Sequence, residues 1–184
     1  MADPSYLVDG VLTDGDALVC IEETSLASVG GLQWDSGTGT KNWSQYEDLL
    51  IIVSSKNTTA GFVYFSTWGL GGSSYFSYQY FSGSGTTAYA GDAADTKGVL
   101  CWGGTSTPTG CVARIHNINS NATKKCVSKS LDNRGSSNGW STLHGTNFLL
   151  DWPITRIDVD YLSGTGGTGS KAWLYGVLPR MGAI

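Results

Sequence analysis

The feature that most constrains the fold of this chain is a two-residue alternation in its last long stretch, residues 154–177. In residues 154–162, apolar or aromatic side chains occupy every second position from Ile157, and charged side chains lie between them. A period of two over this length predicts a half-buried β-strand. Residues 171–177 alternate as well, and the glycine-rich residues 163–170 separate the two segments. The simplest interpretation is a long β-hairpin that closes a sheet.

The alternation also predicts which side chains of this stretch are buried. We expect Leu174 to pack in the core together with Ile157 or Val159. The side chains that should face outward are charged: Arg156, Asp158 and Asp160. A register shift of one residue would exchange the two faces and bury the charged side chains, so the burial of these residues tests the register.

The rest of the chain is a series of short strand patterns separated by turn residues. The apolar run of residues 48–55 predicts a strand covered on both faces, and the aromatic and β-branched residues 61–68 predict a central strand. Residues 88–97 are the least patterned, and we expect a surface loop or a single helical turn there. Further strands are predicted near residues 17–23, 26–34, 74–81, 98–102, 110–116, 123–129 and 140–150.

Apolar residues do not recur at helical spacing across three turns anywhere in the sequence. Many short strands with turn signals every 8–12 residues, roughly, are typical of an all-β antiparallel β-sandwich or jelly roll with very little helix. We expect one β-sandwich domain over residues 17–178, since a chain of 184 residues can bury roughly 70% of its unfolded surface.

The two ends of the chain are too apolar to be solvated tails. Residues 1–16 are predicted to be an N-terminal docking arm, and residues 179–184 a short C-terminal tail. The residues expected to make assembly contacts are apolar or aromatic: Tyr6, Leu7, Val8, Val11, Leu12, Met181 and Ile184.

The chain carries few charges, 14% of its residues against about 25% in a typical soluble domain. Two interpretations fit equally: a surface that packs against neighbours in an assembly, or an extracellular type of β-protein. The net charge of −4, with no large basic cluster, argues against nucleic-acid binding. The longest apolar run, residues 49–53, is too short to cross a membrane.

The N-terminal residues lack the basic and apolar regions of a secretory signal, so we expect the chain to be made and folded in a cytoplasm. Four cysteines lie at spacings unlike those of zinc sites: Cys20, Cys101, Cys111 and Cys126. Free buried thiols are the favoured interpretation in a reduced compartment, and a disulfide between Cys101 and Cys111 is the alternative.

No combination of residues predicts catalysis, a cofactor or a metal site. Residues 164–169 match the G-x-G-x-x-G dinucleotide motif, but a predicted strand follows where the motif requires a helix N-terminus. Asp158 and Asp160 supply too few oxygens for calcium, and Arg156 is an ordinary ion-pair partner for them. His144 with Asp151 lacks the nucleophile elbow of a hydrolase triad.

Two further groups have ordinary structural interpretations. Neighbouring acidic residues fall on opposite faces of a strand, which argues against a glycosidase pair drawn from Glu22, Glu23, Glu47 and Asp48. Aromatic residues would suit a sugar-stacking surface, but a core or subunit interface is favoured. The candidates for an exposed aromatic surface are Trp68, Tyr75, Tyr78 and Tyr80, with Trp102 and Trp140 as further members.

The closing sequence ITRIDVDYLSGTGGTGSKAWLYGV resembles the C-terminal signature of small β-rich virion proteins of tailed bacteriophages. In that family an I-t-x-I strand, a glycine-rich turn and a G-S-x-x-x-L-Y/F-G strand recur at the end. The matching residues here are Ile154, Ile157, Gly169, Ser170, Leu174, Tyr175 and Gly176. The segments WSQYEDLLIIVSS and HNINSNATKKCVS are similar to the family's early and middle strands, so the resemblance spans most of residues 17–178.

The resemblance implies a non-enzymatic β-sandwich of the virion, assembled in the host cytoplasm. We expect a capsid decoration (cement) protein that binds the outer surface of the major capsid shell; the alternative is a tail or tail-fibre part, or a receptor-binding, carbohydrate-binding module. Its partners would be the major capsid protein or other virion proteins. A homo-oligomer, as a trimer, is the family-level expectation, and the resemblance supplies no catalytic residues.

Overall fold

The computed structural model describes residues 7–8, 11–12, 18–67, 76–84, 87–95, 97–132, 140–148 and 152–179. These residues are all-β, as the sequence predicted, and their helical geometry is limited to two 3-10 turns, η1 (Gly39–Lys41) and η2 (Trp43–Gln45). The strands are β1 (Leu7–Val8), β2 (Val11–Leu12), β3 (Leu18–Ser25), β4 (Gly31–Asp35), β5 (Asp48–Ser55), β6 (Gly61–Thr67), β7 (Phe76–Ser84), β8 (Thr87–Asp95), β9 (Gly98–Gly103), β10 (Thr109–His116), β11 (Lys124–Asp132), β12 (Trp140–Phe148), β13 (Arg156–Tyr161) and β14 (Lys171–Val177).

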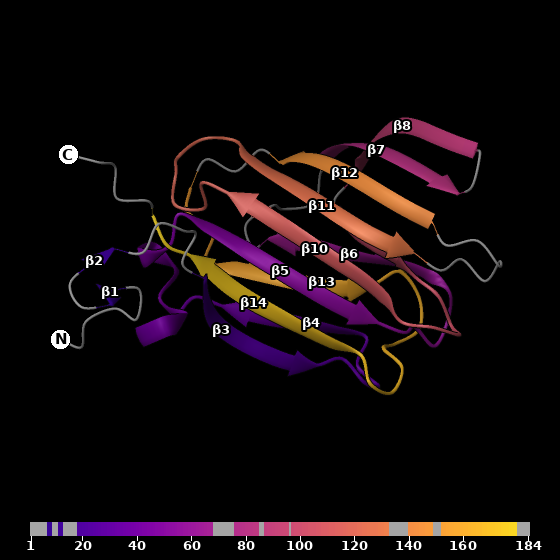
Figure 1. The fold of residues 1–184 in the computed structure, drawn as a ribbon, viewed down its shortest axis with the longest axis horizontal. Coiled ribbons are helices and arrows are strands. Elements are labelled where there is room, and N and C mark those ends of the chain that lie inside the picture. The colour runs from indigo at the N-terminus through magenta and orange to yellow at the C-terminus, as the bar shows by residue number, and fades with distance from the viewer. Residues whose placement is uncertain are drawn as a thin grey trace.

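The strands are arranged in two main antiparallel sheets and one short ribbon (Figure 1). The large sheet has eight strands in the order β3-β14-β5-β10-β11-β12-β7-β8. The small sheet has four, in the order β4-β13-β6-β9, and lies behind the large sheet in the view of Figure 1. β1 and β2 pair with each other beyond the end of the sandwich at which β14 finishes.

A single cluster of buried side chains holds the two main sheets together. Leu49, Ile51 and Leu174 of the large sheet are fully buried. Phe65 and Ile157 of the small sheet are buried to the same extent and belong to the same cluster. Burying a side chain of this size stabilises a fold by about 1.5–3 kcal/mol, so this shared core fixes the sheets face to face. The predicted β-sandwich is therefore confirmed.

The predicted closing hairpin is wrong. β13 lies in the small sheet, where β4 and β6 occupy both of its edges, and β14 lies in the large sheet between β3 and β5. The two strands therefore do not pair with each other, and residues 162–170 carry the chain from one sheet to the other. The alternation fixed the buried face of each strand, but it contains no information about which strand provides the hydrogen-bonding edges.

The predicted burial within these two strands is confirmed. Ile157, Val159 and Tyr161 are buried, whereas the residues between them in β13 are only half-buried. In β14, Ala172 and Leu174 are fully buried. The register is therefore the one that the sequence predicted, although the partner strands are different.

The glycine-rich residues 162–170 pass between two other loops at one end of the sandwich. The amide of Ser28 donates to the carbonyl oxygen of Gly166 at 2.7 Å, and the amide of Thr58 donates to that of Thr165 at 2.9 Å. A Cβ on Gly166 would overlap the carbonyl oxygen of Leu26, so only glycine allows this close approach. β14 follows this segment directly, and no helix N-terminus is present to bind a pyrophosphate.

Two other expectations need correction. Residues 87–95 form strand β8, paired along its length with β7, instead of the predicted loop or helical turn. Their alanines, glycine and aspartates have low β-propensity, so pairing with a neighbour decided the conformation. β5 is central, as expected, but it is not covered on both faces: Leu50, Ile52 and Ser54 are half-buried, because the small sheet packs on one side alone.

Candidate binding faces on the two sides of the sandwich

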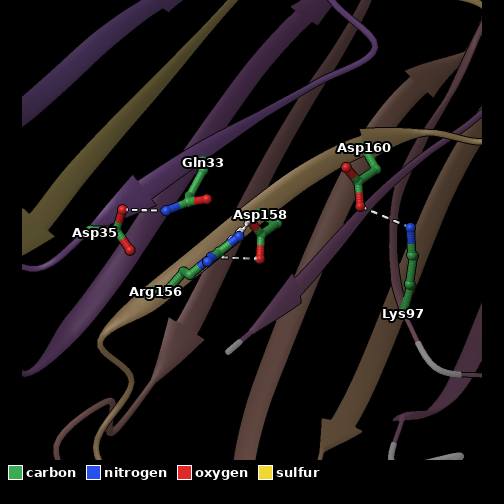
Figure 2. A network of polar contacts seen from close by, with 6 residues as sticks. All are labelled: Gln33, Asp35, Lys97, Arg156, Asp158 and Asp160. Atoms are coloured by element: carbon green, nitrogen blue, oxygen red, sulfur yellow. Dashed lines mark hydrogen bonds and ion pairs between the residues drawn. The ribbon is translucent and has the colours of Figure 1, made fainter. Parts of the chain in front are cut away.

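A row of polar side chains lies on the outer face of the small sheet (Figure 2). β13 presents Arg156, Asp158 and Asp160 outward because the residues between them are buried. The neighbouring β4 adds Gln33 and Asp35 on the same face, opposite Asp158 and Arg156 in the strand register. Lys97 reaches the row from the start of the β9 segment. We call these six residues the polar row.

The members of the polar row hold one another in place. Nε of Arg156 donates to both carboxylate oxygens of Asp158, at 3.0 and 3.1 Å, and its Nη2 donates at 2.8 Å. Nζ of Lys97 donates to Oδ2 of Asp160 at 2.8 Å, and the amide of Gln33 donates to Asp35. The hydrogen bonds to Asp158 raise the pKa of Arg156 above its ordinary value, so the guanidinium is fully charged. The ion-pair interpretation of Arg156 is confirmed.

Three aromatic rings lie beside the polar row. Phe62 and Tyr64 of β6 face outward, with ring centroids 5.7 Å apart. Trp102 of β9 lies opposite Phe62 and meets it edge to face, at 4.8 Å and 87°. Tyr64 is also the register neighbour of Asp160, so the rings and the polar row are contiguous. We call Phe62, Tyr64 and Trp102 the aromatic group.

The outer face of the large sheet is apolar instead. Two cross-strand rows meet on it, one with Trp173, Ile52 and Val112 and the other with Tyr175, Leu50 and Arg114, whose charge is paired with Asp48. Exposed aliphatic residues extend the surface onto the next strands, with Val112 46%, Val127 42% and Leu143 39% exposed. We call this surface the apolar strip; its members are Leu50, Ile52, Val112, Val127, Leu143, Trp173 and Tyr175.

Among the side chains that the structure describes, the charges around the apolar strip are mainly positive. Lys125 and Lys129 of β11 are exposed on the same face and make no ion pair within the part of the chain that the structure describes. Lys129 lies between Val112 and Leu143 in the strand register. Lys171 and Glu23 neutralise each other at the opposite side of the face. The strip is therefore an apolar surface with two uncompensated cations on an otherwise acidic chain.

A buried carboxylate lies at one end of the apolar strip. Oδ2 of Asp48 accepts from Nε of Arg114 at 2.7 Å and lies 3.0 Å from Nδ1 of His116. Its Oδ1 accepts from the amide of Asn117 at 2.8 Å. The Asp48 side chain is 4% exposed, so three donors compensate for its burial. Sequence reasoning missed this network because Asp48 lies more than sixty residues before its three partners. The pairing of β5 with β10 brings them together.

Five of the residues predicted for assembly and for an aromatic surface lie outside the described residues: Tyr6, Trp68, Tyr75, Met181 and Ile184. Leu7 and Val8 pair with Leu12 and Val11 in the β1–β2 ribbon, which is described by its backbone. Tyr78 and Tyr80 belong to β7, where their register neighbours are the buried Thr146 and His144. Of the predicted aromatic residues, Trp102 is the one whose described side chain belongs to the aromatic group.

The remaining candidates for chemistry are dispersed. His144 is buried in β12, and Asp151 lies outside the described residues. Glu22 pairs with Lys41, and Glu23 pairs with Lys171. Within the described ranges, no three His, Cys, Asp or Glu side chains are grouped so that they could hold a metal ion.

The cysteines are free thiols in the structure; the favoured interpretation, a buried free thiol, is confirmed for three of them and is wrong for Cys20. Cys101, Cys111 and Cys126 are buried, and Cys20 is exposed. The thiol of Cys111 donates to the carbonyl oxygen of Leu100 at 3.1 Å. Burial raises the pKa of Cys126 far above its ordinary value, which keeps this thiol protonated and unreactive.

Comparisons with known proteins do not assign the chain to a family. No protein-family model, no curated protein and no solved structure matches it. Across the described residues, no helix has the length and apolar character needed to span a membrane. The two outer faces of the sandwich are therefore the features of this chain that bear on function.

Proposed function

We propose that this protein is a non-enzymatic virion protein of a tailed bacteriophage, a decoration (cement) protein that binds the outer surface of the capsid shell. The observation that supports the proposal most is the apolar strip. Exposed apolar surfaces bordered by polar residues typically mark protein–protein contacts, and Val112 and Val127 are more than 40% exposed at its centre. The resemblance of the closing β13–β14 sequence to virion proteins provides the biological setting.

The charges on the strip indicate the chemistry of its partner. Lys129 lies within the strip and Lys125 beside it, so a partner must offer apolar groups together with carboxylates at matching positions. A second copy docked through the same face would bring lysines against lysines, which disfavours this face for self-association. The predicted homo-oligomer would then form through another surface, and the apolar strip would bind an acidic region of the shell protein.

The strand order gives a second line of support. We infer that eight strands form a jelly roll, with orders β3-β14-β5-β10 and β4-β13-β6-β9, and that β11, β12, β7 and β8 extend one edge. Such an order is that of two interlocked Greek keys, an architecture found in viral capsid and lectin domains. Fold does not establish function, so this argument is an analogy added to the surface chemistry.

The test locates the protein on purified phage particles and then removes the proposed contact. Imaging of labelled particles should show most of the label on the capsid and little of it on the tails. Added to particles that lack it, Val112→Lys and Lys129→Glu should bind at least tenfold more weakly than the unmodified chain, because each places a charge that the partner cannot neutralise. Leu162→Lys is the matched control, since Leu162 is 60% exposed on a loop away from the strip.

Three results would contradict the proposal. Absence from particles would remove the virion assignment altogether. Location on tails alone would favour the alternative class, a tail or receptor-binding part. Equal binding by Val112→Lys and Leu162→Lys would show that the apolar strip is not the docking surface, whereas folded variants with weakened binding would support it.

A further inference from the structure

We propose that the outer face of the small sheet is a binding site for neutral saccharides. The aromatic group would stack against the sugar ring, and the polar row would bind its hydroxyl groups. This face lies on the opposite side of the sandwich from the apolar strip, so docking of the strip would not cover it. The inference rests on the residues of this face and does not require the decoration proposal to be correct.

The aromatic rings lie on the outer face of the small sheet, where they are not needed for the core. β6 alternates strictly, and the core positions of this strand are filled by Val63 and Phe65, which are fully buried. Phe62 and Tyr64 therefore lie on the face that the core does not use, where a strand normally carries polar residues. Trp102 joins them from the next strand at 4.8 Å.

The geometry of the rings suits stacking on a sugar. A pyranose presents a face of C–H groups, and aromatic rings offer a rigid surface of matching size and polarity. Because Phe62 and Trp102 are fixed edge to face, little side-chain entropy remains to be lost on binding. Since the two rings are nearly perpendicular, a sugar would stack on the face of one of them, and the other would hold that ring in position.

The polar row offers a hydrogen-bond acceptor beside the aromatic group, the carboxylate of Asp160. A carboxylate has about four acceptor positions, and the salt bridge of Asp160 with Lys97 occupies one of them. Asp160 also lies over Gly31 of β4, where a Cβ would overlap its carboxylate. The missing side chain at Gly31 leaves room for the Asp160 carboxylate on the β4 side of β13, and Tyr64 is the register neighbour of Asp160 on the other side. A hydroxyl of a sugar bound at the aromatic group would donate to this carboxylate.

The charge of the face decides the class of saccharide. Asp35, Asp158 and Asp160 oppose two cations, Arg156 and Lys97, and each cation is already paired with a carboxylate. No excess of positive charge remains to attract sulfate or uronate groups. The face therefore fits a neutral hexose or pentose oligosaccharide and disfavours an anionic polysaccharide.

The experiment measures binding of the full chain to defined probes by calorimetry and by affinity electrophoresis. The neutral probes are hexaoses of glucose, mannose, galactose and xylose, and heparin is the anionic probe. We expect saturable binding of at least one neutral probe and none of heparin. Trp102→Ala and Asp160→Asn should each weaken that binding at least tenfold, whereas Trp173→Ala, an aromatic residue of the other outer face, should leave it unchanged.

Several outcomes would overturn the inference: no binding of any neutral probe, stronger binding of heparin, or equal binding by Trp102→Ala and the unmodified chain. If circular dichroism shows that Trp102→Ala is unfolded, Asp160→Asn tests the inference instead, because the Asp160 side chain lies outside the core. Failure here leaves particle binding through the apolar strip intact, and failure of particle binding leaves saccharide binding intact. The two proposals can therefore be judged separately.

Discussion

β13 and β14 are close in sequence and share the same alternation, yet they lie in different sheets and present opposite kinds of surface. Both bury aliphatic side chains, such as Ile157 and Leu174, in one core. Outward, β13 carries paired charges beginning with Arg156, and β14 carries Trp173 and Tyr175. The inward faces of the two strands are thus equivalent, and the outward faces differ.

The difference between the outward faces follows from the different constraints on the two sides of each strand. The inward faces need only be apolar and of fitting size, because the core contacts both sheets alike. The outward faces are free to differ, because the small sheet covers just one side of the large sheet. One side of the sandwich thereby becomes apolar with uncompensated lysines, and the other combines aromatic rings with neutralised charges.

The largest expected effect tests the equivalence of the inward faces. Leu174→Ala and Ile157→Ala should each lower the free energy of unfolding by about 2–5 kcal/mol, because each leaves a cavity in the shared core. Urea unfolding followed by tryptophan fluorescence measures both. A neutral result for either variant would mean that its strand has been placed in the wrong register.

The next prediction concerns the segment that separates the two strands. Gly166→Ala should lower the free energy of unfolding by about 3 kcal/mol, because the added Cβ meets backbone at Leu26 and cannot be relieved by a rotamer change. Gly145→Ala in β12 is the matched control, since nothing lies near its added Cβ. Equal melting curves for the two variants would contradict the close passage of residues 162–170 between the loops.

A smaller effect should distinguish the carboxylates of the two outer faces. Asp48→Asn should lower the free energy of unfolding by about 2 kcal/mol, because it weakens a buried acceptor of hydrogen bonds from Arg114 and the Asn117 amide. Asp158→Asn should cost less than about 1 kcal/mol, because its ion pair is partly exposed to water. Chemical unfolding of the two variants in parallel gives the comparison, and the reverse order would show that the Asp48 network is not formed.

The smallest expected effect is a dependence of stability on alkaline pH. Burial raises the pKa of Tyr161 above its ordinary value of 10.0, against a weaker opposing effect of its 2.9 Å hydrogen bond with Ser55. Above about pH 10 the unfolded chain therefore loses this proton first, and stability that is complete below that pH declines as pH rises. Tyr161→Phe should reduce this slope in unfolding curves measured between about pH 9 and pH 11; an unchanged slope would show that Tyr161 is not responsible.

Several parts of the fold could be predicted because they depend on local patterns. The buried positions of β13 and β14, the lack of helix and most strand locations follow from alternation and turn residues. Residues 87–95 could not, because their strand depends on pairing with β7. The aromatic group was missed for a related reason: Phe62 and Tyr64 are in a strand that the sequence predicted only as central, and the sheet arrangement shows that one of its faces is outward.

Alternation and turn residues are enough to predict that this chain is all-β and which faces of its last two strands are buried. The tertiary structure alone decided that β13 and β14 belong to different sheets. It also placed Trp102 beside Phe62, and Asp48 beside Arg114. The physical reason is that alternation is a property of one strand, whereas hydrogen-bonding edges and outer surfaces are shared between strands distant in sequence.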